Sequence, residues 1–185
     1  MKTSKTLPEV SVVLAVRNVE DAVAAEVRRI VLHMRQLGRP FEVVAVNAGS
    51  WDTSFKVLRL LAADVPELRL MEKDLTGRAF VRGAAESLGR AVVLIDADRA
   101  PSALAPLGWS LSRLAAGKEA VVVRGRFIVA RRLPALPAIA RSRGRGDAFE
   151  RSFEREGNDL ALEVVGKVRK APNGLFAPVW RLLAA

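Results

Sequence analysis

The chain has 185 residues, half of them hydrophobic, which suffices for one domain with an apolar core and excludes a disordered polar tail. It has no cysteine and one histidine, so disulfides and cysteine chemistry are excluded, and a histidine-based triad or zinc cluster is disfavoured. The net charge of +10 favours anionic partners such as nucleotides, nucleic acid or an acidic lipid surface. With no apolar run of membrane-spanning length and no signal-peptide core, the expected location is cytoplasmic.

Apolar runs of strand length alternate with helical patterns up to residue 123. Asn18 and Ser50 are suited to cap the first two helices. Strands that are apolar on both faces and alternate with helices predict an α/β fold, with a mostly parallel central sheet and helices on both faces. The expected strands are 10–16, 41–46, 68–71, 91–95 and 120–123, and the expected helices are 19–37, 50–61, 77–88 and 103–116.

The alternation weakens after Arg124. The run Leu-Pro-Ala-Leu-Pro at 133–137 argues against a regular helix interior or a central strand, and the glycine-rich run 141–146 is polar. Residues 127–146 are therefore predicted to be a mobile, basic and proline-rich segment within a single domain, 1–185. A helix is expected at 147–165 and a short terminal element at 176–183.

Two acids, Asp96 and Asp98, follow the fourth apolar run, where a buried strand opens into a loop. The carboxyl ends of strands in open α/β sheets are where ligands bind. Two carboxylates there can hold one Mg²⁺ or Mn²⁺ ion, whose shell substrate phosphates usually complete. The alternative is that both acids cap a turn or the following helix, which is common for aspartate.

Arginines concentrate between residues 124 and 155. A guanidinium suits bidentate contacts with phosphate, whereas the alternative is a solvated basic surface. The acids at 147, 150 and 154 share one helix face, where ion pairs with Arg143 and Arg151 are the simpler interpretation. The candidates for contacts with a phosphate or an acceptor are Arg124, Arg126 and Arg131.

Several segments occur in the order typical of one enzyme family. The run Ser-Val-Val-Leu-Ala-Val-Arg-Asn at 11–18 resembles the opening strand of family-two glycosyltransferases with the A-type fold. The run Asn-Ala-Gly-Ser-Trp-Asp-Thr at 47–53 is similar to the family's Asp-Asp-Gly-Ser-x-Asp segment, and Asp96-Ala97-Asp98 stands where the family has Asp-x-Asp. The resemblance covers residues 10–126 and is strongest to dolichol-phosphate mannosyltransferase-like enzymes, which use polyprenol-phosphate acceptors.

This resemblance implies the nucleotide-diphospho-sugar transferase (A-type) fold and a nucleotide-diphosphate sugar as the donor. It implies Mg²⁺ or Mn²⁺ at Asp96 and Asp98, with Asp98 in catalysis. It also implies a lipid-phosphate acceptor and a protein peripheral to the inner face of a membrane; a homo-oligomer is left open. The nucleotide-binding positions that follow are Ala15, Arg17, Asn47, Asp52, Arg78 and Asp96.

The chain departs from the family at several positions. Ala15 and Arg17 replace a proline and a tyrosine, and Asn47 and Ala48 replace the paired acids. Asn47 either accepts a hydrogen bond from the base or forms an Asx turn. No residue matches the catalytic base; Glu150 is a candidate by position, and a phosphate acceptor, already anionic, needs no base.

Three functions are therefore compatible with the sequence. The first is a metal-assisted, nucleotide-sugar-dependent glycosyltransferase acting on a lipid phosphate. The second is a degenerate relative that binds a nucleotide or a protein partner without turnover. The third is a basic nucleic-acid-binding α/β domain; it rests on charge alone and lacks a recognised motif, so nucleic acid is the disfavoured partner.

Overall fold

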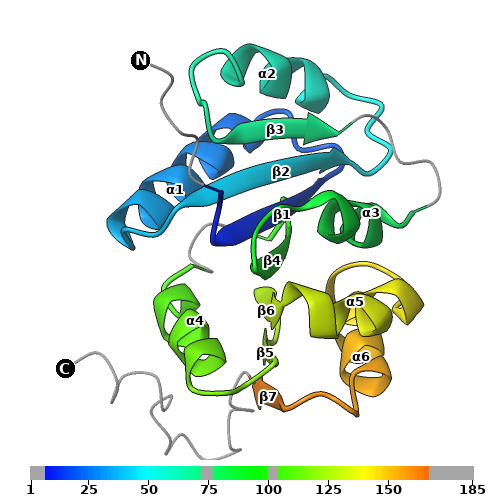
Figure 1. Cartoon of the computed structure of the whole chain (residues 1–185). Coiled ribbons are helices and arrows are strands. Elements are labelled where there is room, and N and C mark those ends of the chain that lie inside the picture. Colours follow the sequence, from blue (N-terminus) through cyan, green and yellow to red (C-terminus); the bar gives the residue numbers. More distant parts are fainter. Residues whose placement is uncertain (1–6, 72–76, 100–103, 167–185) are drawn as a thin grey trace, which may run out of the picture.

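The structure, a computed structural model, describes residues 7–71, 77–99 and 104–166. A seven-stranded sheet in the order β3-β2-β1-β4-β6-β5-β7 forms its centre (Figure 1). The strands are β1 (Val10–Val16), β2 (Phe41–Asn47), β3 (Leu68–Met71), β4 (Ala91–Asp96), β5 (Ala120–Val123), β6 (Phe127–Arg131) and β7 (Leu162–Val165). The helices are α1 (Val23–Gln36), α2 (Ser54–Leu61), α3 (Ala79–Glu86), α4 (Leu107–Ala115), α5 (Arg132–Arg141) and α6 (Gly146–Glu156).

The predicted mostly parallel sheet is confirmed. β1 pairs in parallel with both β2 and β4, β2 with β3, and β5 with β7, whereas β6 runs antiparallel to β4 and β5. The chain leaves β1 on one side to form β2 and β3, then returns to the other side of β1 to form β4. The carboxyl ends of β1 and β4 thus flank the point where the strand order reverses, and such points bind ligands in open α/β sheets.

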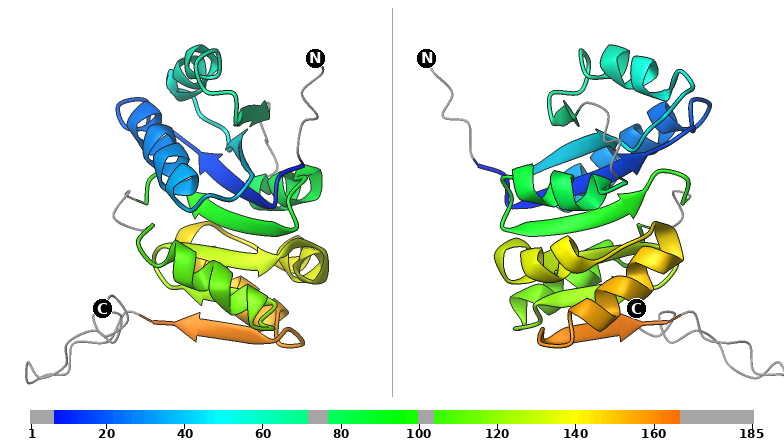
Figure 2. Two further views of the ribbon diagram at one scale, coloured as in Figure 1. Left: turned by 60° about the vertical axis from the view of Figure 1, so that its left-hand side comes forward. Right: turned by 90° about the vertical axis from the view of Figure 1, so that its right-hand side faces the viewer.

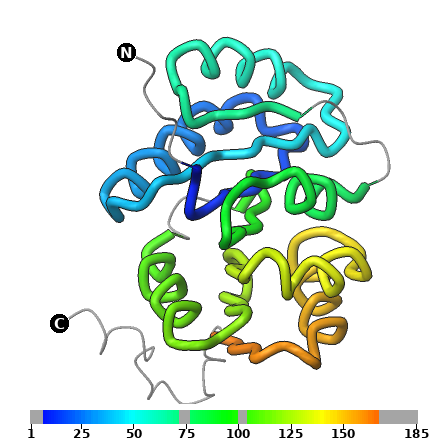
Figure 3. Tube along the Cα trace, in the orientation of Figure 1, coloured from blue at the N-terminus to red at the C-terminus, as the bar shows by residue number. Residues whose placement is uncertain are grey.

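Each face of the sheet carries its own apolar layer. Helices α1, α2 and α4 cover one face, and α3, α5 and α6 cover the other (Figures 2 and 3). Along β1, Val12 and Leu14 join the first layer, while Val13 and Ala15 join the second. Because both faces are covered, every residue of the strand except Ser11 is apolar.

The run 133–137 lies in a helix, contrary to the expectation from its prolines, and a strand precedes that helix. β6 is an inner strand of the sheet, and α5 follows it directly. Pro134 is tolerated because it lies in the first turn of α5, where N–H groups have no intrahelical acceptor. Pro137 lies inside the helix on its exposed side, while Ala138 and Ile139 pack in the core.

The helix predicted at 147–165 is also wrong in its second half. α6 ends at Glu156 because Gly157 follows, and the apolar run 162–165 instead forms β7 against β5. The predicted element at 176–183 lies outside the described residues. In the part of the chain that the structure describes, no helix combines the length and apolarity needed to cross a bilayer.

Asn18 and Ser50 do not cap helices, because α1 begins at Val23 and α2 at Ser54. Asn18 Oδ1 accepts a hydrogen bond from the Trp51 backbone N–H at 3.0 Å. The Ser50 hydroxyl donates to the Val16 carbonyl at 3.2 Å. Both side chains therefore tie the loop after β1 to the loop after β2.

Candidate functional site

Asp96 lies at the carboxyl end of β4, opposite Ala15 of β1, and its side chain is only 3% exposed. Its Oδ2 accepts the backbone N–H of Gly146 at 2.7 Å, and its Oδ1 accepts a hydrogen bond from Arg145 Nη2 at 3.2 Å. Burial raises the pKa of Asp96, while the Arg145 charge and the Gly146 N–H lower it. The loop before α6 therefore closes directly onto the end of β4.

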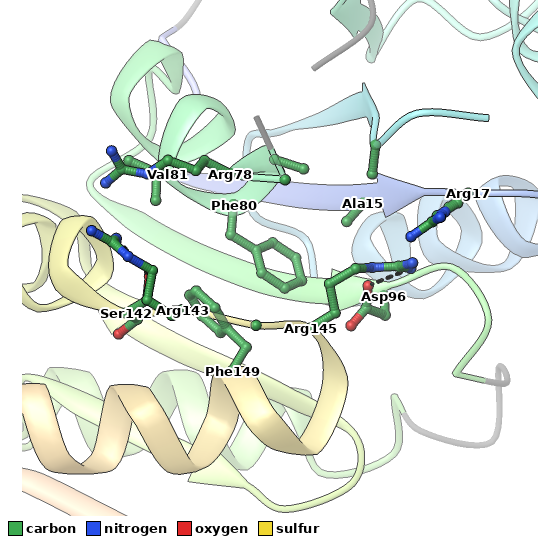
Figure 4. A pocket seen from close by; sticks show the side chains of 14 residues that line it. Ala15, Arg17, Arg78, Phe80, Val81, Asp96, Ser142, Arg143, Arg145 and Phe149 are labelled. Carbon is green, nitrogen blue, oxygen red and sulfur yellow. Dashed lines mark hydrogen bonds and ion pairs between the residues drawn. The ribbon is translucent and has the colours of Figure 1, made fainter. Parts of the chain in front are cut away.

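A cavity of about 310 Å³ adjoins Asp96, with walls from the end of β1, the start of α3 and the residues between α5 and α6. Its volume is at the lower end of the range for small-molecule sites. In Figure 4, Arg17 and Arg145 lie at the Asp96 end of the cavity, and Arg78 and Arg143 at the other. Four guanidinium groups against one carboxylate give the lining a positive charge, which suits an anionic ligand.

The loop between α5 and α6 is fixed by its own sequence. Gly144 and Gly146 have φ angles of 86° and 52°, the left-handed region that favours glycine. A Cβ atom on Gly146 would also overlap the Arg99 guanidinium. The Arg143 backbone N–H donates to the Ser152 hydroxyl at 3.0 Å, which anchors the loop to α6.

Glu150 holds α6 against the turn between β5 and β6. Its Oε2 accepts the Gly125 N–H at 2.8 Å, and its Oε1 lies 3.4 Å from Arg99 Nη1. The same Arg99 nitrogen is 2.7 Å from Asp147 Oδ1. Burial raises the pKa of Glu150, while the Gly125 N–H and the Arg99 charge lower it. Both of its oxygens are engaged within the fold, and its role as a base stays a prediction.

The acid pair does not fit a divalent metal ion in this arrangement. Mg²⁺ needs a near-octahedral shell of oxygen ligands. Both oxygens of Asp96 already accept N–H donors, and one donor is a cation. Asp98 is exposed, and no three acidic, histidine or cysteine side chains gather as metal ligands within residues 7–71, 77–99 and 104–166.

Two residues predicted to contact the nucleotide, Asn47 and Asp52, accept backbone hydrogen bonds within the fold, and their contact with a nucleotide stays a prediction. Asn47 Oδ1 accepts the N–H groups of Gly49 at 3.2 Å and Ser50 at 2.8 Å, which is the Asx-turn alternative. Asp52 Oδ1 accepts the Ser54 N–H at 3.0 Å at the start of α2, and its Oδ2 accepts the Glu20 N–H at 3.1 Å. Desolvation raises the pKa of Asp52, but the hydrogen bonds it accepts outweigh this and lower it. Ala15, Arg17 and Arg78, by contrast, do line the cavity.

The three arginines predicted to bind phosphate lie in different places. Arg124 is exposed and makes a two-point ion pair with Glu154, at 2.9 and 2.6 Å. Arg126 lines a separate small cavity between Asp96 and Glu150. Arg131 pairs with Ala91, at the amino end of β4, and donates to the Leu114 carbonyl at 2.8 Å. Arg131 is therefore at the opposite edge of the sheet from Asp96, which is a correction to its predicted role.

The prediction also missed Arg99 and Arg145. Arg99 pairs with Asp147 and Glu150, and Arg124 pairs with Glu154. The sequence signal for the loop was the alternation of arginine and glycine at 143–146, because glycines so spaced permit a tight turn. Nothing in the sequence indicated that this turn meets Asp96.

No family model matches the chain. It is similar to two undecaprenyl-phosphate 4-deoxy-4-formamido-L-arabinose transferases, from Pectobacterium carotovorum (strain PC1) and Pectobacterium atrosepticum, with 32% and 31% identity over 97 residues. The match covers 50% of this chain and 29% of each relative, so the chain spans less than a third of their length.

Among solved structures, the chain resembles a mannosyltransferase from Pyrobaculum calidifontis, solved in complex with GDP-Man and Mn²⁺. The TM-score is 0.65 at 17% identity, over 92% of this chain and 60% of the other. At that identity the likeness establishes the fold, which is the predicted nucleotide-sugar transferase fold.

Proposed function

We propose that the chain binds a nucleotide-diphosphate sugar in the arginine-lined cavity and transfers the sugar to a lipid-phosphate acceptor. The observation that carries the proposal is the position of this cavity, at the reversal point of an A-type sheet beside the last residue of β4. One guanidinium can donate hydrogen bonds to two phosphate oxygens at once, and four arginines line the cavity. The relatives' names support a sugar donor and a lipid-phosphate acceptor.

In the proposed reaction, an oxygen of the acceptor phosphate attacks the anomeric carbon of the sugar. The new carbon–oxygen bond forms as the bond from that carbon to the donor's diphosphate breaks, and the nucleoside diphosphate leaves with the electron pair. Arg17 and Arg145, at the Asp96 end of the cavity, would stabilise the charge that builds on this leaving group. The acceptor phosphate is already ionised, so the step requires no general base.

The acceptor assignment also bears on where the protein works. A lipid phosphate would bring the protein to the surface of a membrane, and anionic lipids attract a chain of net charge +10. We therefore propose peripheral association with the inner face of a membrane. Mg²⁺ or Mn²⁺ as the cofactor stays a prediction; the Mn²⁺ in the mannosyltransferase structure supports it, while the hydrogen bonds to Asp96 oppose it.

A second candidate function is nucleotide binding without turnover. One observation favours it: Asn47 stands where the family has an acid, and its amide oxygen is committed to a turn. Such a protein would bind a nucleoside diphosphate but would neither release it from a sugar nucleotide nor form a glycolipid.

Isothermal titration calorimetry with UDP, GDP and their sugar conjugates tests the donor site. We expect binding by the wild type, and weaker binding by Arg17→Ala and Arg78→Ala. Losing one charged hydrogen-bond donor costs about 1.5–3 kcal/mol, which is at least about tenfold in Kd. Arg151→Ala is the matched control because Arg151 is an exposed arginine outside the cavity lining.

Turnover separates the two candidate functions. Release of the nucleoside diphosphate that depends on a polyprenyl phosphate in vesicles would support the transferase. Binding without release would support the second candidate. If neither UDP nor GDP binds, or if Arg151→Ala weakens binding as much as Arg17→Ala does, the donor-site proposal fails.

A further inference from the structure

Asp96 already has a cation beside it. The guanidinium of Arg145 donates to one carboxylate oxygen at 3.2 Å, and the Gly146 N–H donates to the other at 2.7 Å. Arg99 adds a second positive charge, because its guanidinium lies against Gly146 and interacts electrostatically with Asp96. A metal ion at Asp96 would have to share the carboxylate oxygens with these donors and lie next to like charges.

One nitrogen of the Arg145 guanidinium has no hydrogen-bond partner in the described part of the chain. This nitrogen, Nε, is buried. A buried donor without a partner is costly, and a turn of the guanidinium toward the cavity would let a phosphate oxygen satisfy it. The side chain is one-third exposed and lines the same cavity as Arg17. Arg145 therefore contacts the buried carboxylate of Asp96 and also lines the positively charged cavity.

We infer that Arg145, oriented by Asp96, supplies the positive charge at the donor's diphosphate, so that this chain binds the nucleoside diphosphate without a divalent ion. The inference rests on the proposed function. In this arrangement Asp96 positions a guanidinium, whereas the sequence predicted that it would hold a metal. The glycines on either side of Arg145 allow the tight turn that brings it there.

The wild-type protein tests the inference without any substitution. Calorimetric titration of UDP and GDP is run once with EDTA and once with MnCl₂. We expect Kd values that agree within about twofold, because the charge at the diphosphate belongs to the protein. Binding that occurs only with Mn²⁺ overturns the inference and leaves the donor-site proposal standing. No binding under either condition overturns both.

Variants then identify the cation. With EDTA present, Arg145→Ala is expected to weaken nucleotide binding by at least about tenfold, while Arg151→Ala, on the exposed side of α6, leaves it unchanged. Arg145→Lys keeps the charge but loses the paired donors, so its affinity should lie between the two. If Arg145→Ala is folded by circular dichroism and binds as the wild type does, the inference is wrong.

Discussion

At the scale of single residues, the site depends on glycine as much as on charge. Gly146 has a φ of 52° and presents its N–H to Asp96 at 2.7 Å. A side chain at this position would take a strained backbone conformation and would overlap the Arg99 guanidinium. The residue that begins α6 thus fixes the distance between the helix and the end of β4.

We expect Gly146→Ala to destabilise the protein by about 1–3 kcal/mol, because the φ must change or Arg99 must move. It should also weaken nucleotide binding, since Arg145 shifts with its neighbour. Urea denaturation and calorimetry measure the two effects. Gly166→Ala serves as the control because a Cβ atom there meets open space. Equal stability of the two variants would contradict the role given to Gly146.

Residue patterns in the sequence predicted part of this site. Asp96 was identifiable because it follows a buried strand, and the carboxyl ends of strands in open α/β sheets are where ligands bind. Its contact with Gly146 was not, because 50 residues separate the two and the contact depends on how α6 packs. Arg131 was misplaced for the same reason: its position depends on β6 running antiparallel to β4.

At the scale of elements, the inner parallel strands were predictable because both of their faces are buried. β1, β2 and β4 match the expected ranges within about one residue at each end. α5 was not predictable from local rules, since Pro137 removes an N–H that would donate to the Leu133 carbonyl. Burial of Ala135, Ala138 and Ile139 against the sheet outweighs that loss.

Replacing Pro137 tests this balance. Pro137→Ala restores the missing helical hydrogen bond at an exposed position, and we expect a stability gain of up to about 2 kcal/mol, reduced by the greater freedom of the unfolded chain. Pro134→Ala, in the first turn, should change stability by less than about 0.5 kcal/mol. Thermal and urea unfolding measure both. A loss of stability in Pro137→Ala would show that the proline is required where it stands.

Helix α1 buries an acid, Glu26, whose side chain lies in the covered face of the helix. Burial raises its pKa above the ordinary 4.5, and the Arg29 charge only partly offsets this. As the pH rises, the carboxyl of Glu26 therefore loses its proton at a lower pH in the unfolded chain than in the folded protein. The Glu26 contribution to stability therefore falls as the pH rises from the ordinary pKa through the raised one.

We accordingly expect Glu26→Gln to raise the free energy of unfolding near neutral pH, and to lose this advantage at about pH 3, where the carboxyl is protonated in both states. Urea denaturation at the two pH values measures the difference. The exposed Asp159→Asn is the control. A gain that is the same at both pH values would mean that burial of the charge is not its cause.

At the scale of the whole molecule, the cavity exists only because distant parts of the chain meet. Its walls come from the end of β1, the start of α3 and the loop between α5 and α6. The fold could be predicted from the order of strands and helices, and the site's location followed from the reversal between β1 and β4. The identity of the arginines around it depended on packing that no local pattern encodes.

NMR chemical-shift mapping of the isotopically labelled chain with UDP and GDP shows whether a nucleoside diphosphate binds in this cavity. We expect amide shifts at residues 15, 17, 77–79 and 143–145, which line the cavity, upon addition of at least one of the two. The absence of shifts would contradict this binding. So would shifts confined to the separate hollow lined by residues 18–22, 51 and 52.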